Sequence, residues 1–348
     1  MPQIGAGQPD ELLDAEDFPR TIRVRDILVI PSPGHRADAQ EWLDHPAVDA
    51  AVDLGNGVSL ERLTGDDVAG QVIHASIPRG LNFDATRQFG QLYSFWREVP
   101  EGEWEQPSFF NWDPDAHLSQ AIAISRLVLD NAHGFEFAGR VFDRSDGTRR
   151  IAPLTGHEGR VAYRTRKSRF WFTTQEAADL SALLDQYRRC HDELPGRVRR
   201  ALWQVDRSCY SRYITEAATH IVTGFEALVN TGRAEPATKQ FTRRAKALAD
   251  ELGIETSGRY WSWVYDVRSR IVHGAEGRLV APVGWDETDA EPPADVAKIA
   301  KAQDVLRAAI RRAIEDETFR YVFSSDESVR SRWPLPRRRR VWRRLWRD

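Results

Sequence analysis

The pattern of apolar and polar residues along the chain changes near residue 174. Before that point, short runs alternate between the two kinds, as T-I-R-V-R-D-I-L-V-I does at residues 21–30. Alternation of this kind predicts strands with one buried face. The predicted elements of this part are strands over residues 21–30, 71–77 and 161–173, a hairpin turning at Asp146-Gly147, and one helix over residues 117–129. Residues 1–173 are therefore predicted to form a mixed, β-rich domain.

From Thr174 onward the apolar residues recur every three or four positions. T-T-Q-E opens this part with threonine caps and an early glutamate, which predicts the start of a helix. In the next predicted helix the apolar stripe is Ile214, Ala218, Ile221, Phe225 and Leu228. Helices are predicted from Thr174, from Pro195 to Asn230, and over residues 237–252, 257–273 and 294–323. Residues 174–325 are thus predicted to be an all-α bundle, which makes the whole chain α+β.

Composition and charge narrow the class of protein. The 348 residues are 41% hydrophobic and 29% charged, which suits two soluble domains with real cores. The net charge is −3, yet residues 330–348 hold nine arginines and one aspartate, so the remaining chain carries −11. An acidic body of this kind does not suit bulk nucleic-acid binding, and any RNA contact is expected to be local.

Several expectations concern absences. No secretory signal or apolar run of membrane-spanning length is visible, so we expect a cytoplasmic protein. Cys190 and Cys209 lack metal-ligand spacing and fall in helical sequence, so we expect them to be reduced core thiols. Neither a metal site nor a cofactor is expected.

The last segment, residues 326–348, mixes arginine with tryptophan. Arginines neutralise phosphates, and tryptophans stack on bases or lie at a bilayer interface. The simplest interpretation is a solvated terminus; RNA contact ranks next, and an anionic membrane surface ranks last. The residues that would contact RNA are Arg337, Arg338, Arg339, Arg340 and Trp342.

The predicted helix at residues 257–273 carries the candidate chemistry, in the stretch Y-D-V-R-S-R-I-V-H-G. Arg268 lies on a flank beside aromatic and aliphatic residues, which predicts a half-buried side chain. Arg270 lies on the far side, four residues after Asp266, and is expected to form an ordinary surface pair with it. His273 precedes a glycine suited to ending the helix, and the negative end of the helix dipole favours its protonated form. A histidine of this kind can act as general acid or base.

Glu226 in the preceding helical stretch offers a partner for Arg268. It lies on a largely apolar flank, where an unpaired carboxylate is costly. Such a pair either braces the bundle or orients the guanidinium toward a phosphate, and the structural role ranks first. Arg268 and His273 lie about 140° apart around one straight helix, so they meet only if the helix ends near Val272 or if a second copy of the chain contributes. Taken alone, a salt-bridging arginine and a helix-capping histidine remain the simpler interpretation.

Three segments together resemble an ApeA-like HEPN domain: F-E-A-L at residues 225–228, F-T-R-R-A-K-A-L at residues 241–248, and R-S-R-I-V-H-G at residues 268–274. The family hallmark is an arginine followed, after four to six residues, by a histidine. Arg268 and His273 match it with four residues between them. The resemblance covers roughly residues 174–325.

This resemblance implies a metal-independent endoribonuclease that works as a homodimer through its helical domain. The two arginine–histidine motifs would face each other across the dimer axis, with His273 moving protons and Arg268 binding the scissile phosphate. The family often has Asn, Asp or His after the arginine, where this chain has Ser269, which hydrogen-bonds phosphate but takes no part in acid–base chemistry. The implied biology is a toxin or an antiphage defence effector whose N-terminal domain meets a phage-derived trigger or a regulatory partner. The alternative is a non-catalytic HEPN module that serves as an interaction or nucleotide-binding scaffold.

Overall fold

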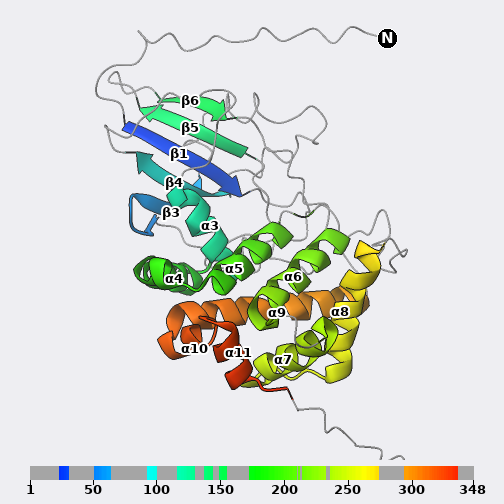
Figure 1. Cartoon of the computed structure of the whole chain (residues 1–348). Coiled ribbons are helices and arrows are strands. Elements are labelled where there is room, and N and C mark those ends of the chain that lie inside the picture. The colour runs from blue at the N-terminus through cyan, green and yellow to red at the C-terminus, as the bar shows by residue number, and fades with distance from the viewer. Residues whose placement is uncertain are drawn as a thin grey trace, which may run out of the picture. The chain divides into compact units, whose positions relative to one another are not determined.

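The computed structural model describes residues 23–30, 51–63, 92–99, 116–129, 137–143, 149–154, 172–209, 211, 214–232, 236–273 and 294–335 (Figure 1). Contacts between backbones divide the chain into two compact units. One comprises Met1–Arg160 with Arg169–Asp185, and the other comprises Val161–Ser168 with Gln186–Asp348. The predicted domain boundary at residue 174 stays a prediction.

The described part of the first unit contains an antiparallel sheet with strand order β2-β3-β4-β1-β5-β6. Strand β1 lies between β4 and β5, so that Leu28 is opposite both Phe95 and Ala138. The strands are β1 (Arg23–Ile30), β2 (Val52–Asp53), β3 (Val58–Leu63), β4 (Leu92–Val99), β5 (Phe137–Asp143) and β6 (Arg149–Leu154), and the helix of this sheet region is α3 (Ala116–Val128). Helix α3 contacts β3 and β4.

These elements confirm some predictions and add to them. The strand predicted at residues 21–30 is β1, the predicted helix is α3, and β5 and β6 pair as the two antiparallel strands of the predicted hairpin, whose turn at Asp146-Gly147 lies outside the described residues. Strands β2, β3 and β4 were not predicted. The strand predicted at residues 71–77, and residues 161–171 of another, lie outside the described residues. The β-rich character of residues 1–173 as a whole therefore stays a prediction, and helices make up most of what is described.

The sequence G-N-G forms the turn between β2 and β3. Gly55, Asn56 and Gly57 all have positive φ angles, of 77°, 52° and 73°, in the left-handed region that glycine and asparagine tolerate best. The backbone N–H of Gly55 donates to Asp53 Oδ1 at 2.7 Å, and that of Leu54 donates to the Val58 carbonyl at 2.8 Å. These glycines therefore serve a tight turn.

Helix α4 (Thr174–Cys190) begins with the predicted capping box. Thr173 Oγ1 accepts from the backbone N–H of Glu176 at 3.2 Å, and Glu176 Oε2 accepts in return from the backbone N–H of Thr173 at 2.9 Å. Two N–H groups that a helix start leaves unpaired are thereby satisfied.

The second unit is built from helices packed around α6 (Ile214–Val229), which contacts α5, α7, α8 and α9. These are α5 (Gly196–Cys209), α7 (Ala237–Glu251), α8 (Gly258–Val272) and α9 (Ala294–Glu315), and they are followed by α10 (Glu317–Tyr321) and α11 (Asp326–Arg332). Gly224 permits the close approach of α6 to its neighbours. A Cβ at that position would lie 2.7 Å from Leu306 Cδ2 and 3.3 Å from Gln204 Cβ.

The prediction of one long helix from Pro195 to Asn230 was wrong, because α5 ends at Cys209 and α6 begins at Ile214. Two serine hydroxyls bond backbone carbonyls near the end of α5: Ser208 donates to Val205 at 2.6 Å and Ser211 to Arg207 at 3.1 Å. Serine side chains offer the backbone an alternative to the helical ladder in this way. The division lets α5 pack along α6 and bury both apolar stripes.

Buried aromatic side chains join α6, α7 and α8. The ring of Trp261 is fully buried, with its centroid 4.8 Å from that of Phe225 and 6.1 Å from that of Phe241, at steep interplanar angles. Edge-to-face pairs of this kind add to the hydrophobic stabilisation of a core. Cys190 and Cys209 are buried free thiols, as expected.

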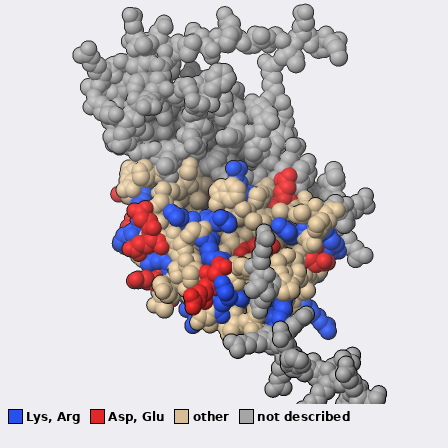
Figure 2. Space-filling view, in the orientation of Figure 1, with Lys and Arg blue, Asp and Glu red and all other residues tan. Residues whose placement is uncertain are grey.

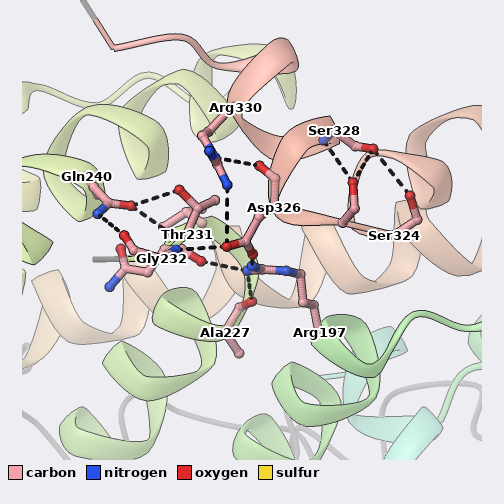
Figure 3. Close-up of polar contacts among 12 residues, drawn as sticks. Arg197, Ala227, Thr231, Gly232, Gln240, Ser324, Asp326, Ser328 and Arg330 are labelled. Carbon is pink, nitrogen blue, oxygen red and sulfur yellow. Dashed lines mark hydrogen bonds and ion pairs between the residues drawn. The ribbon is translucent and has the colours of Figure 1, made fainter. Parts of the chain in front are cut away.

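Helix α11 lies within the segment predicted to be a basic tail, and it packs on the helical unit. Asp326 forms an ion pair with Arg197 and accepts from the backbone N–H of Gly232 at 2.8 Å (Figure 3). That hydrogen bond, and then the charges of Arg197 and Arg330, hold the pKa of Asp326 below its usual range. Arg197 also donates to the carbonyls of Ala227 and Asn230 at the end of α6.

Trp333 lies in the segment whose simplest interpretation was a solvated terminus, yet it is only 6% exposed. Its ring lies 5.8 Å from that of Phe323, and its Nε1 donates to Glu251 Oε2 at 3.0 Å. Arg332 binds the same carboxylate at 2.5 and 3.1 Å. The chain is thus anchored to the helical unit as far as Trp333.

Within the described residues, no helix is long and apolar enough to cross a membrane. The same part of the chain contains no group of three or more His, Cys, Asp or Glu side chains placed to hold a metal ion.

Candidate functional site

Helix α8 positions the candidate residues, and its ends and packing follow from its sequence. Ser257 caps the start, where its hydroxyl accepts from the backbone N–H of Tyr260 at 3.1 Å. Trp261, Val264 and Val267 are buried, and the hydroxyl of Tyr260 donates to the Lys298 carbonyl of α9 at 2.7 Å. The rotation of α8 about its axis is therefore fixed, and with it the direction of every other side chain.

Arg268 and Glu226 form the predicted pair between α8 and α6. Arg268 Nη2 lies 3.7 Å from Glu226 Oε2, and the two side chains are 31% and 21% exposed. This distance suits an ion pair but exceeds a hydrogen bond. The Nε atom of Arg268 is buried and makes no hydrogen bond to a described residue. The arginine thus keeps donor capacity while a carboxylate holds its position.

Glu226 is held in a partly apolar environment. Burial raises the pKa of its carboxyl above the ordinary value, and the charge of Arg268 opposes that rise without cancelling it. The loss of hydration therefore outweighs the attraction across the 3.7 Å gap. This balance indicates that the pair contributes little net stability.

His273 caps the end of α8. The helix ends at Val272, and the backbone N–H of His273 donates to the Ser269 carbonyl at 3.1 Å. The side chain of His273 is exposed and makes no contact with Arg268 in the described structure. The predicted helix end is confirmed, but one chain does not join the two candidate groups.

The neighbouring residues take simpler roles. Arg270 Nε lies 3.2 Å from Asp266 Oδ2, with the two side chains 40% and 63% exposed, which confirms the predicted surface pair. Ser269 is half-buried one position after Arg268. Arg337, Arg338, Arg339, Arg340 and Trp342 lie outside the described residues, so their proposed contact with RNA stays a prediction.

Two further polar residues of the helical unit were not singled out from the sequence. Half-buried His220 on α6 lies 2.7 Å through its Nδ1 from Gln204 Oε1, and burial followed by the charge of Arg207 lowers its pKa. Arg244 on α7 is 2% exposed and donates to four groups, among them the carbonyls of Val229 and Trp333. Arg244 stands within the segment F-T-R-R-A-K-A-L, but its spacing alone does not separate it from the exposed Arg243 beside it.

Comparisons of the chain with protein-family models, curated proteins and solved structures find no match. The resemblance of residues 225–228, 241–248 and 268–274 to an ApeA-like HEPN domain therefore stays a hypothesis.

Proposed function

We propose that this protein is a metal-independent endoribonuclease of the HEPN type, acting in the cytoplasm as a homodimer. The observation that carries the proposal is the arrangement at the end of α8. An exposed His273 follows, by five residues, a half-buried Arg268 whose guanidinium is held by Glu226 and retains free donors. In cleavage of a phosphodiester next to a 2′-hydroxyl, an imidazole can move the protons and an arginine can stabilise the negative charge that grows on the phosphate.

In the proposed reaction the ribose 2′-oxygen attacks the adjacent phosphorus. His273 takes the proton of that hydroxyl, the bond from phosphorus to the 5′-oxygen breaks, and the leaving oxygen receives a proton. The products are a 2′,3′-cyclic phosphate and a 5′-hydroxyl. Arg268 binds the non-bridging oxygens, where negative charge grows, while Glu226 orients the guanidinium and Ser269 offers a hydroxyl to the phosphate.

A second copy of the chain would complete this site. Five residues along a helix correspond to about 140° between side-chain directions, so Arg268 and His273 of one chain diverge. Two copies facing each other through the helical unit would bring one chain's arginine to the other's histidine. In each arginine–histidine pair formed in this way, the histidine would take the proton of the 2′-hydroxyl and return it to the leaving 5′-oxygen.

The biological role that fits such an activity is a toxin or an antiphage defence effector. Residues 1–173 would receive a phage-derived trigger or a regulatory partner. The residues Arg337 to Arg340 and Trp342 would add contacts to RNA.

The alternative is a non-catalytic HEPN module that acts as an interaction or nucleotide-binding scaffold. The observation in its favour is that the Arg268–Glu226 pair joins α8 to α6 and thus resembles a structural brace. The exposure of His273 favours catalysis, because a bracing histidine would be buried and hydrogen-bonded within its own chain.

The test is RNA cleavage in EDTA by the wild-type chain and by Arg268→Ala and His273→Ala. We expect activity in the chelator and a loss of at least about a hundredfold in each variant with the fold unchanged, since general acid–base catalysis contributes about 10²–10⁴-fold. Arg270→Ala, which removes only a surface pair, is the matched control and should retain activity. Cleavage that persists in His273→Ala would refute the mechanism.

Mixing the two inactive variants tests the composite site. A heterodimer of Arg268→Ala with His273→Ala keeps one arginine and one histidine, which would lie together if the site spans both chains. Partial recovery of cleavage on mixing is expected. RNA cleavage by the wild-type chain in a fraction that elutes as a monomer on size exclusion would contradict the two-chain site.

A further inference from the structure

Helix α5 presents a row of basic and aromatic side chains to solvent, which we name the α5 ridge: Arg200, Trp203 and Arg207. These positions are spaced by three and four residues, so they lie within about 60° of one another around the helix. The opposite face of α5 is buried through Val198, Ala201, Leu202 and Val205. The ridge therefore points outward, and Lys and Arg side chains gather over α5 on the face shown in Figure 2.

The arginines of the α5 ridge have no carboxylate at helical spacing. The positions three and four residues away from Arg200 and Arg207 within α5 are glycine, arginine, tryptophan and glutamine. No ion pair joins either arginine to a described residue. Elsewhere in the helical unit the sequence supplies such carboxylates, as in the pairs Arg311–Glu315 and Lys246–Asp250. Both ridge arginines are exposed and thus keep their charges available to a partner.

Trp203 gives the ridge an exposed ring. It is 51% exposed, and the guanidinium of Arg207 lies 5.3 Å from the centre of the ring. That cation–π contact holds the arginine beside the indole. Half of the residue still remains accessible, which leaves area on which a planar group can stack.

Two carboxylates lie close enough to weaken the positive field. Asp206 is half-buried on α5, next to Arg207 in the sequence. Glu216 is exposed on α6, and its charge and that of Arg207 both act on His220. Neither is paired with Arg200 or Arg207 in the described structure, so a cationic row remains between them.

We propose that the α5 ridge binds single-stranded RNA, with Arg200 and Arg207 on phosphates and a base stacked on Trp203. Alternating arginine and aromatic side chains are the combination that tracks a single strand without reading its sequence. An acidic peptide would use the two charges but not the ring. The ridge thus favours RNA over an acidic protein partner.

The position of the ridge suits the proposed cleavage site, and this inference rests on the proposed function. Helix α6 packs against both α5 and α8, through Gln204–His220 on one side and Glu226–Arg268 on the other. Because both helices pack on α6, the axes of α5 and α8 lie at most about 20 Å apart, which is two interhelical spacings. A short oligonucleotide spans such a distance, so the ridge would hold the strand that continues beyond the scissile phosphate.

The test measures binding apart from cleavage. The full-length His273→Ala chain is titrated into a fluorescein-labelled single-stranded RNA of mixed sequence, and anisotropy is followed at several salt concentrations. In this background Trp203→Ala should weaken binding about tenfold through lost stacking. The pair Arg200→Ala/Arg207→Ala should lower the slope of log affinity against log salt by about 1.4, since each phosphate contact on a single strand contributes about 0.7.

The matched control is Arg243→Ala/Arg259→Ala, which removes two exposed arginines from α7 and α8. This control pair should change the affinity for RNA less than the ridge pair does, and it contains no change equivalent to the loss of the Trp203 ring. All substitutions are at exposed positions, and circular dichroism verifies the fold. Equal effects of the ridge pair and the control pair would overturn the proposal.

Other partners are separate arms of the test. Ridge-dependent binding of polyglutamate or of vesicles containing anionic lipid, with RNA binding unaffected by the ridge, overturns the RNA assignment. Ridge-dependent RNA binding by a chain whose wild type does not cleave supports the ridge and refutes the nuclease. Cleavage by the wild type, together with unchanged RNA binding in the ridge variants, supports the nuclease and refutes RNA binding by the ridge.

Discussion

Replacing Arg244 with methionine should strongly destabilise the helical unit. Arg244 is 2% exposed and has four acceptors. Its Nε donates to the Trp333 carbonyl at 3.1 Å, and its Nη1 donates to the Val229 carbonyl at 3.0 Å, to Thr231 Oγ1 at 3.0 Å and to Gln240 Oε1 at 2.9 Å. The guanidinium thus joins the end of α6, the start of α7 and the segment after α11.

The size of the expected loss of stability depends on which acceptors would lose their hydrogen-bond donor. Thr231 and Gln240 bond each other, since Gln240 Oε1 accepts from the backbone N–H of Thr231 at 2.8 Å, so they remain satisfied. The carbonyls of Val229 and Trp333 would lose a charged donor, and each buried unsatisfied group costs about 1–3 kcal/mol. Methionine keeps most of the volume and avoids burying a charge, which offsets part of this cost. A loss of about 3–5 kcal/mol is expected, a large share of a typical stability of about 5–15 kcal/mol.

The assay is urea unfolding of the full chain, monitored by tryptophan fluorescence. Trp333 and Trp261 contribute to this signal from inside the helical unit. Thermal unfolding should shift by about 2–4 °C for each kcal/mol. Lys246→Met on the same helix removes an exposed pair with Asp250 and should change stability by less than about 1 kcal/mol. If Arg244→Met changes stability no more than Lys246→Met does, then Arg244 does not hold the end of α6, the start of α7 and the segment after α11 together.

Two further substitutions test the packing of α6. Glu226→Gln should alter the pH dependence of stability. Because the folded-state pKa of Glu226 is raised, its contribution is fully present below the unfolded value and is lost as pH rises through the raised pKa. The glutamine variant should lack this loss and be at least as stable as wild type at neutral pH, while the proposed RNA cleavage should fall because Arg268 loses its orienting charge. Unfolding curves measured across a pH series check this, and a variant less stable than wild type at pH 7 would contradict it. Gly224→Ala should destabilise by about 1 kcal/mol, because the new Cβ would meet the buried Leu306 side chain at 2.7 Å and Gln204 at 3.3 Å. Overpacking costs about 1–3 kcal/mol, which exceeds the gain of about 1 kcal/mol in helix propensity from glycine to alanine. A variant that is more stable than wild type in equilibrium unfolding would contradict this and show that the core adjusts to the added methyl group.

The helix ends were predictable because local chemistry sets them. Thr173, Ser257 and Gly253 each act through groups within a few residues of themselves. Gly253 has a φ of 72°, and the backbone N–H of Ile254 donates back to the Ala249 carbonyl at 2.9 Å, which closes α7 with a Schellman motif. Interactions of this range are visible in a single sequence.

Features that depend on distant partners were missed. The apolar stripe continues from α5 into α6, so periodicity alone does not show that the chain turns between Cys209 and Ile214. Trp333 is buried because Glu251, Phe323 and Arg244 meet it, and these residues are 82, 10 and 89 positions away. The arginine-rich composition after residue 330 pointed instead to a solvated tail.

The pairing of Arg268 with Glu226 was predictable for a different reason. A carboxylate on an apolar flank of α6 and an arginine on an aromatic flank of α8 each need a partner, and the bundle gives them few choices. Their separation of 3.7 Å and the unpartnered Nε atom were not predictable, because they depend on how Trp261 and Phe225 set the helices.

The hydrogen bonds that Arg244 and Arg268 make distinguish an arginine with a structural role from one that is available for chemistry. Arg244 is buried and directs its Nε and Nη1 donors to four acceptors of its own chain, which leaves no room for a ligand at those atoms. Arg268 is one-third exposed, and its guanidinium makes no hydrogen bond to a described residue, while Glu226 holds it at ion-pair distance. Because the Arg268 side chain is partly exposed and an arginine fork matches the geometry of phosphate oxygens, this difference favours Arg268 as the guanidinium that would meet a phosphate of the proposed RNA substrate.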